Sequence, residues 1–125
     1  MSKKSTGNKG EQLAAEYLEK KGFKILATNF FIQWGEIDIV AVKENKLHFI
    51  EVKTRTSVRK GRPEEAVNFK KLKRIWKAGI IFMGQNKIKQ PFQIDVLAVL
   101  MDKQQNKIFI RYFPNISFDT HFNKR

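Results

Sequence analysis

The sequence predicts a single α/β domain that contains two helices and five strands. Its 125 residues are 42% hydrophobic, which is enough for one core but too little chain for two ordinary domains. Two segments repeat apolar residues at helical spacing, and five short segments are rich in β-branched and aromatic residues. The expected order is α-β-β-β-α-β-β. We expect a basic, flexible N-terminus over about 1–8, and the pattern assigns no element to about 114–125.

The first helix is predicted over 10–21, because Ala14 and Leu18 recur at helical spacing and Gly22 follows as a terminator. Asn8 is a candidate N-cap, and Glu11 then occupies the position of a capping-box acid. Apolar and β-branched runs predict three strands over 23–31, 35–42 and 47–55. A polar turn over 43–46 separates the second strand from the third.

The second helix is predicted to open at Pro63, with Glu64 and Glu65 in its first turn, and to end at Gly84. Its apolar stripe places Trp76 in the core and consists of Phe69, Leu72, Trp76, Ile80 and Met83. Four cations lie on the opposite side of this helix: Lys70, Lys73, Arg74 and Lys77. Two further strands, over 92–100 and 108–113, complete the domain.

The composition excludes some kinds of site and favours some kinds of partner. The chain has no cysteine, which excludes disulfides and thiolate zinc sites and fits a reducing compartment. A formal net charge of +13 favours an anionic partner, and nucleic acid is the commonest such partner of a small basic domain. No segment has the length of a signal peptide or a membrane span, so we expect a cytoplasmic protein with no membrane partner.

Two predicted strands carry charged residues inside apolar runs, namely Asp38 in the second strand and Glu51 and Lys53 in the third. Buried charges are costly unless they are paired or bind a metal. The short turn favours an antiparallel hairpin, and a two-residue loop at 44–45 would place Asp38 directly opposite Glu51. A three-residue loop would shift this match by one position.

Opposed carboxylates have Cβ atoms about 4.5–5.5 Å apart and repel one another unless a cation lies between them. Oxygen-only ligation points to Mg²⁺ or Mn²⁺. The two-residue period of a strand places Lys53 on the same face as Glu51. A divalent ion and an ammonium beside it are the equipment for hydrolysing a phosphodiester. Glu11 points with the apolar face of the first helix and is a candidate fourth member.

Several residues admit two interpretations. Glu11 is either the capping-box acid or a site acid, and Glu36 is either a ligand or, as we favour, a residue at the rim. His48 is expected on the face away from Glu51, and Trp34 is an open candidate for stacking on bases. The four helix cations are either a solvated face or phosphate contacts. A better candidate for holding a nucleic-acid backbone is the basic loop after the third strand, with Arg55, Arg59, Lys60 and Arg62.

The combined motifs resemble, in order and spacing, the YraN-like family of uncharacterised bacterial predicted endonucleases. The matching residues lie between about 8 and 99: Gly10-Glu11, Asn29, Gly35-Glu36-Ile37-Asp38, Phe49-Ile50-Glu51-Val52-Lys53-Thr54-Arg55 and Gln93-Ile94-Asp95-Val96. That family is similar in fold to archaeal Holliday junction resolvases and belongs with the PD-(D/E)xK nucleases.

The resemblance implies a restriction-endonuclease-like mixed sheet flanked by helices. It also implies that Asp38, Glu51 and the carbonyl of Val52 hold the metal, that Lys53 is the catalytic lysine and that Glu11 completes the site. Asp95 is left with a supporting role, and related resolvases act as homodimers. We therefore expect a Mg²⁺- or Mn²⁺-dependent endonuclease of DNA, including branched or junction DNA. The alternatives are a non-catalytic nucleic-acid-binding protein that keeps this fold and a basic structural partner of a larger assembly.

Overall fold

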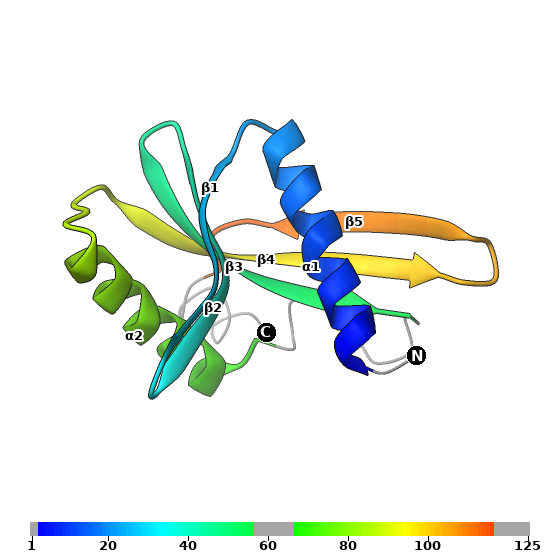
Figure 1. Ribbon diagram of the computed structural model, residues 1–125, viewed down its shortest axis with the longest axis horizontal. Coiled ribbons are helices and arrows are strands. Elements are labelled where there is room, and N and C mark those ends of the chain that lie inside the picture. Colours follow the sequence, from blue (N-terminus) through cyan, green and yellow to red (C-terminus); the bar gives the residue numbers. More distant parts are fainter. Residues whose placement is uncertain (1–2, 57–66, 117–125) are drawn as a thin grey trace, which may run out of the picture.

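The computed structural model describes residues 3–56 and 67–116, and the side chains from Asn8 onward. Figure 1 shows two helices and a twisted sheet of five strands. The elements are α1 (Lys3–Lys20), β1 (Lys24–Ile32), β2 (Gly35–Lys43), β3 (Lys46–Arg55), α2 (Phe69–Gln85), β4 (Phe92–Asp102) and β5 (Lys107–Phe113). The predicted order α-β-β-β-α-β-β is confirmed.

The sheet is mixed, with the strand order β1-β2-β3-β4-β5. β3 and β4 run parallel, whereas the other neighbouring strands are antiparallel. A parallel pair needs a crossover connection, and α2 lies in the connection between β3 and β4. The predicted mixed sheet flanked by helices is therefore confirmed.

Each helix covers one face of the sheet and forms its own core. On the α2 face, Leu72, Ile75 and Phe82 belong to the same buried cluster as Val40 and Phe49. On the α1 face, the cluster of fully or almost fully buried residues includes Ala14, Leu18, Ile39, Ile50 and Leu97. The alternation of side chains along β2 and β3 thus divides apolar residues between two layers.

The hairpin between β2 and β3 has the predicted register. Lys43 pairs with Lys46, and the pairing continues without a shift to Ile39 opposite Ile50. The two loop residues, Glu44 and Asn45, have φ angles of 53° and 63°. Two consecutive positive φ angles are typical of the type I′ turn, whose twist matches that of the flanking strands. The two-residue loop is therefore confirmed.

Helix α1 begins seven residues earlier than predicted, at Lys3 instead of residue 10. Asn8 lies inside the helix, so its assignment as N-cap and that of Glu11 as capping-box acid are wrong. Residues 3–8, which were expected to lie outside the helix, belong to α1. No proline interrupts these residues, and lysine is a good helix former, so a helix that packs on the sheet can extend toward the N-terminus.

Helix α2 begins later than predicted. Its N-cap is Asn68, whose Oδ1 accepts a hydrogen bond of 2.9 Å from the backbone N–H of Lys71. The expected start at Pro63 is wrong, because Val67 and Asn68 are not helical, and residues 63–66 lie outside the described ranges. The helix also extends past Gly84 to Gln85. Within the described residues, neither α2 nor α1 has the length and apolar character needed to cross a membrane.

The predicted apolar stripe of α2 is partly wrong. Leu72 is buried, but Phe69, Trp76 and Ile80 are 49%, 43% and 41% exposed. The buried stripe instead consists of Leu72, Ile75, Ala78, Gly79 and Phe82. A Cβ atom on Gly79 would lie 2.4 Å from the Phe49 ring, so the helix uses its smallest residues where it crosses the sheet.

Candidate active site

Asp38 and Glu51 lie side by side where β2 and β3 separate. The two strands pair as far as Ile39 and Ile50, and Asp38 directly precedes Ile39 in β2. Its Oδ2 atom accepts a hydrogen bond of 2.8 Å from the backbone N–H of Val52. Burial and the neighbouring Glu51 carboxylate raise the pKa of Asp38 to about 7. The structure therefore brings together the two carboxylates that the hairpin register predicted.

A kink at Asn29 positions Asp38. β1 and β2 pair at Thr28 with Ile39 and at Phe30 with Ile37, and the intervening Asn29 has a φ of 52°. Asparagine tolerates this left-handed conformation better than most residues. The side chains of Phe30 and Ile37 consequently pack in the α2-side core, while Asp38 remains at the bend.

Glu11 of helix α1 lies near enough to the two carboxylates to interact electrostatically with both. The helix approaches β3 closely at Gly10, where a Cβ atom would lie 1.9 Å from Oγ1 of Thr54. Burial raises the pKa of Glu11, a hydrogen bond with the Asn29 side chain opposes this, and the carboxylates of Glu51 and Glu36 raise it further. The structure thus favours the site interpretation of Glu11 over the capping one.

Two lysines neutralise the acids. Nζ of Lys53 lies 3.3 Å from Oε2 of Glu51, as the strand period predicted, and Nζ of Lys71 lies 3.5 Å from the same oxygen. Lys71 also donates a hydrogen bond of 3.3 Å to Oε1 of Glu36. Burial lowers the pKa of Lys71, but Glu51 and Glu36 more than offset this and raise it, so the ammonium stays charged.

Lys71 was missed by the sequence analysis, which singled out its neighbours Lys70 and Lys73. Its helical spacing could have identified it. Lys71 lies four residues before Ile75 and seven before Ala78, so it belongs to the stripe that faces the sheet. Glu36 is the partner that fixes its orientation, and the Glu36 side chain is 37% exposed, consistent with a place at the rim.

The acids can hold a divalent ion. Glu51 is 3% exposed, and its Oε1 atom is buried without a hydrogen-bond partner among the described residues. A buried carboxylate oxygen without a partner is costly, and a cation would satisfy it. Because a strand residue directs its N–H and C=O to the same side, the carbonyl of Val52 lies on the side of β3 that faces β2 and Asp38.

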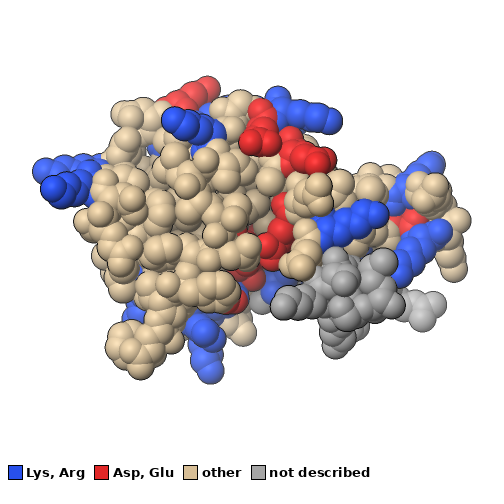
Figure 2. Space-filling view, viewed as in Figure 1, with Lys and Arg blue, Asp and Glu red and all other residues tan. Residues whose placement is uncertain are grey.

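This ligand set fits Mg²⁺ or Mn²⁺. Within 3–56 and 67–116, no three acidic or histidine side chains are grouped closely enough to form a complete metal site by themselves. Magnesium typically takes only one or two protein carboxylates and fills its other positions with water and substrate phosphate. Figure 2 shows acidic side chains along the middle of one face with basic side chains beside them.

The predicted nucleic-acid contacts divide into three groups. Arg55 ends β3 and is partly buried. Arg59, Lys60 and Arg62 lie outside the described residues. The helix cations are exposed on α2, as predicted: Lys70, Lys73, Arg74 and Lys77.

Asp95 lies on the α1 face of the sheet, away from Glu51, and forms a second polar cluster there instead of supporting the candidate site as expected. Its Oδ2 atom accepts hydrogen bonds from Nδ1 of His48 at 2.7 Å and from the Tyr112 hydroxyl, and its Oδ1 atom from Gln93 at 2.7 Å and the Asn115 backbone at 2.8 Å. Burial raises the pKa of Asp95, but these hydrogen bonds outweigh it and lower the pKa. This cluster ties β3, β4 and β5 together.

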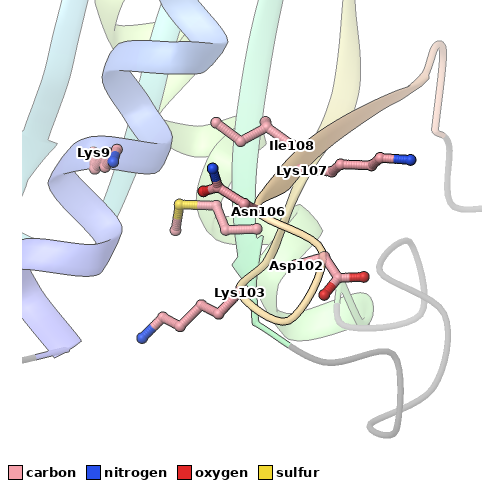
Figure 3. Close-up of a pocket in the computed structure, with 7 residues that line it drawn as sticks. Lys9, Asp102, Lys103, Asn106, Lys107 and Ile108 are labelled. Carbon is pink, nitrogen blue, oxygen red and sulfur yellow. The ribbon is translucent and has the colours of Figure 1, made fainter.

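A small pocket lies between α1 and the turn that joins β4 to β5 (Figure 3). Its volume is about 160 Å³, well below the roughly 300 Å³ at which small-molecule sites begin. The lining residues are Lys9, Met101, Asp102, Lys103, Asn106, Lys107 and Ile108. None of them is a predicted site residue, so the acid cluster remains the candidate active site.

Comparison with known proteins places these residues in a family. The model of "Uncharacterised protein family UPF0102" matches residues 10–99, which include all four site acids and both site lysines. The chain belongs to family UPF0102. A UPF0102 protein of Caldanaerobacter subterraneus subsp. tengcongensis is 42% identical over 84% of this chain and 87% of its own length. A UPF0102 protein of Syntrophomonas wolfei is 44% identical over 79% of this chain and 87% of its own length. A UPF0102 protein of Clostridioides difficile is 40% identical over 86% of this chain and 96% of its own length.

Proposed function

We propose that this UPF0102 protein is a metal-dependent endonuclease that hydrolyses phosphodiester bonds of DNA, including branched or junction DNA. The observation that carries the proposal is the pair of adjacent carboxylates at Asp38 and Glu51, with an unpartnered buried oxygen on Glu51 and the Lys53 ammonium 3.3 Å from its other oxygen. The ion pair between Glu51 and Lys53 does not account for this oxygen, because buried carboxylate oxygens usually have a donor.

The residues that would hold Mg²⁺ or Mn²⁺ are Asp38, Glu51 and, through its backbone carbonyl, Val52. When bound, the ion supplies Lewis acidity to the phosphodiester and lowers the pKa of water. Oxygen ligands and the absence of cysteine fit these two hard cations.

The protein's own groups divide the remaining tasks. Lys53 places its ammonium next to Glu51, where it can stabilise negative charge that develops on a phosphoryl oxygen. Glu11 approaches the site from α1, the helix on the other face of the sheet from α2. Its raised pKa suits it to hold a water molecule and to accept a proton from it. Lys71 holds Glu36 and Glu51 in place from α2.

The charge distribution supports a nucleic-acid substrate. The chain carries a formal net charge of +13, although four of its twelve acids, Glu11, Glu36, Asp38 and Glu51, lie at the site. The four exposed cations of α2 belong to the helix that also supplies Lys71, so a backbone bound along this helix would reach the acid cluster.

The test is incubation of purified protein with end-labelled linear duplex, single-stranded, flap and four-way-junction DNA in Mg²⁺ or Mn²⁺. We expect cleavage by the wild type and a loss of at least about 100-fold in the rate for Asp38→Asn and Lys53→Ala. Matched controls are Glu19→Gln, an exposed acid of α1, and Lys46→Ala at the other end of β3, and both should cleave normally.

Cleavage that persists unchanged in both site variants would refute the mechanism. Binding without any cleavage, with an affinity that falls steeply as salt rises, would instead favour the alternative of a non-catalytic nucleic-acid-binding protein. The exposed cationic face of α2 is the observation that supports this alternative.

A further inference from the structure

Aromatic side chains are exposed at the end of the β1–β2 hairpin. Phe31 is 66% exposed and Trp34 is 63% exposed, the two highest values among the exposed large hydrophobic residues of the described ranges. Trp76 on α2 is 43% exposed. Single exposed apolar residues are common, but several large aromatic rings on neighbouring elements indicate a binding surface.

The hairpin end lies next to the acid cluster. Phe31 is the Cα partner of Glu36, and directly opposed residues of an antiparallel pair project to the same face. Oε1 of Glu36 lies 3.3 Å from Nζ of Lys71, which in turn lies 3.5 Å from Oε2 of Glu51. The side chains of Glu36 and Lys71 therefore connect the Phe31 position to Glu51, the candidate metal ligand.

Helix α2 packs against the β1–β2 hairpin at Gly35. A Cβ atom on Gly35 would lie 2.3 Å from the backbone oxygen of Arg74 and 3.3 Å from Cβ of Ala78. The turn that carries Trp34 thus rests directly on the helix that presents the exposed cations, and Trp76 lies within the same stretch of α2.

Phe30 and Ile32 pack in the core on the α2 side, so Phe31 projects from the opposite face of the hairpin, away from the exposed cations of α2. The cations linked to its strand partner Glu36 are Lys71, which contacts Glu36 directly, and Lys53, which shares the Glu51 carboxylate with Lys71.

This combination fits a strand of nucleic acid with unpaired bases. Proteins bind single strands through cations that follow the backbone and aromatic rings on which bases stack. Bases inside a duplex are already stacked on one another and offer no free face. A second copy of this chain is a poorer occupant, because a symmetric contact would join two proteins that each carry a formal net charge of +13.

We propose that Phe31 and Trp34 form a stacking platform for unpaired bases, and that the platform directs the acid cluster to phosphodiesters at single-stranded or branched positions. The inference rests on the proposed nuclease function and names the structural class of its substrate. The platform selects unstacked bases and not a particular sequence, because every base has a π-face.

The test measures binding in EDTA, so that cleavage plays no part. Affinities for oligo(dT), a four-way junction and a blunt duplex of equal length are compared for wild type, Phe31→Ala, Trp34→Ala and the matched control Phe109→Ala. Phe109 is 45% exposed on β5, in the edge strand at the other side of the sheet. We expect each platform variant to bind oligo(dT) and the junction about 5- to 150-fold more weakly, with duplex affinity unchanged within about twofold.

Fluorescence supplies an independent readout. The chain has two tryptophans, so Trp76→Phe leaves Trp34 as the only one. Oligo(dT) should quench the emission of this variant, whereas duplex should not.

Equal losses on all three DNAs, or no loss in either platform variant, would overturn the inference. Dissociation of a dimer by Phe31→Ala and Trp34→Ala without any change in oligo(dT) affinity would also overturn it, because the surface would then bind a second copy. Thermal unfolding midpoints within a degree of wild type exclude misfolding as the cause of a loss. Absence of cleavage in Mg²⁺ would count against the proposed function alone, since the binding experiment contains no metal.

Discussion

Replacing Asp38 with asparagine is expected to stabilise the metal-free protein at neutral and alkaline pH. The substitution removes the charge that burial and Glu51 disfavour. It also keeps a side-chain oxygen that can accept the hydrogen bond from the Val52 N–H. Asp38→Asn should thus increase the stability of the folded protein and weaken metal binding at the candidate active site.

The magnitude follows from the difference between the ordinary pKa of 3.8 and the raised pKa of about 7. One pKa unit corresponds to about 1.4 kcal/mol, so ionised Asp38 costs the folded state roughly 4 kcal/mol. Between these two pKa values the folded protein binds more protons than the unfolded chain, so stability falls as the pH rises. The stabilisation from protonated Asp38 is complete below pH 3.8 and is lost as the pH rises through about 7.

Urea unfolding in EDTA at pH 5 and pH 8 measures this effect. We expect the free energy of unfolding of the wild type to fall by about 2–3 kcal/mol over this interval relative to Asp38→Asn. Glu19→Gln, which alters an exposed acid, should follow the wild type. Added Mg²⁺ should stabilise the wild type at pH 8 and leave Asp38→Asn unaffected. A variant that is less stable than the wild type at pH 8 in EDTA would refute the reasoning.

Three further substitutions test other parts of the structure by urea unfolding. Lys71→Met should destabilise the protein by about 1–3 kcal/mol because Glu36 and Glu51 lose a charged donor, whereas Lys77→Met, at an exposed position of α2, should be neutral. Equal effects of the two substitutions would contradict the proposed contact. Gly79→Ala should cost about 1–3 kcal/mol by pressing on Phe49, whereas Gly84→Ala, with open space around it, should cost nothing; the reverse order would contradict the packing. Asp95→Asn should cost at least about 2 kcal/mol at pH 7, and the difference should shrink below about pH 4, as wild-type Asp95 protonates; a constant difference would argue against its lowered pKa.

The strands and the hairpin were predictable from the sequence because they depend on local information. Alternating residues define each strand, and a two-residue polar turn fixes the register to within one position. Helix boundaries were harder. Asn8 and Glu11 match a capping pattern, but nothing local prevents the helix from continuing to Lys3.

The face of α2 was ambiguous for a different reason. Two stripes share Leu72, one running through Trp76 and the other through Ile75, and both have helical spacing. The stripe with the smaller residues packs against the sheet, because the helix approaches the Phe49 ring closely at Gly79. The sequence carries Gly79 but does not say which residue lies opposite it.

The candidate site was predictable where it lies within one hairpin and not where it depends on distant elements. Asp38, Glu51 and Lys53 follow from register and parity alone. Lys71 reaches them from the crossover helix, and His48 meets Asp95 only once β3 and β4 pair in parallel. These contacts join residues 20 or more positions apart and depend on tertiary packing, which periodicity does not encode.

The exposed turn at Glu44 and Asn45 has a consequence for how this chain can change its length. Surface turns usually tolerate insertions well. Here, one additional residue in the turn would shift β2 against β3 and carry Asp38 away from Glu51, six residues distant from the insertion. Gains and losses of single residues should therefore be absent from this turn in functional relatives, although Glu44 and Asn45 themselves lie outside the acid cluster.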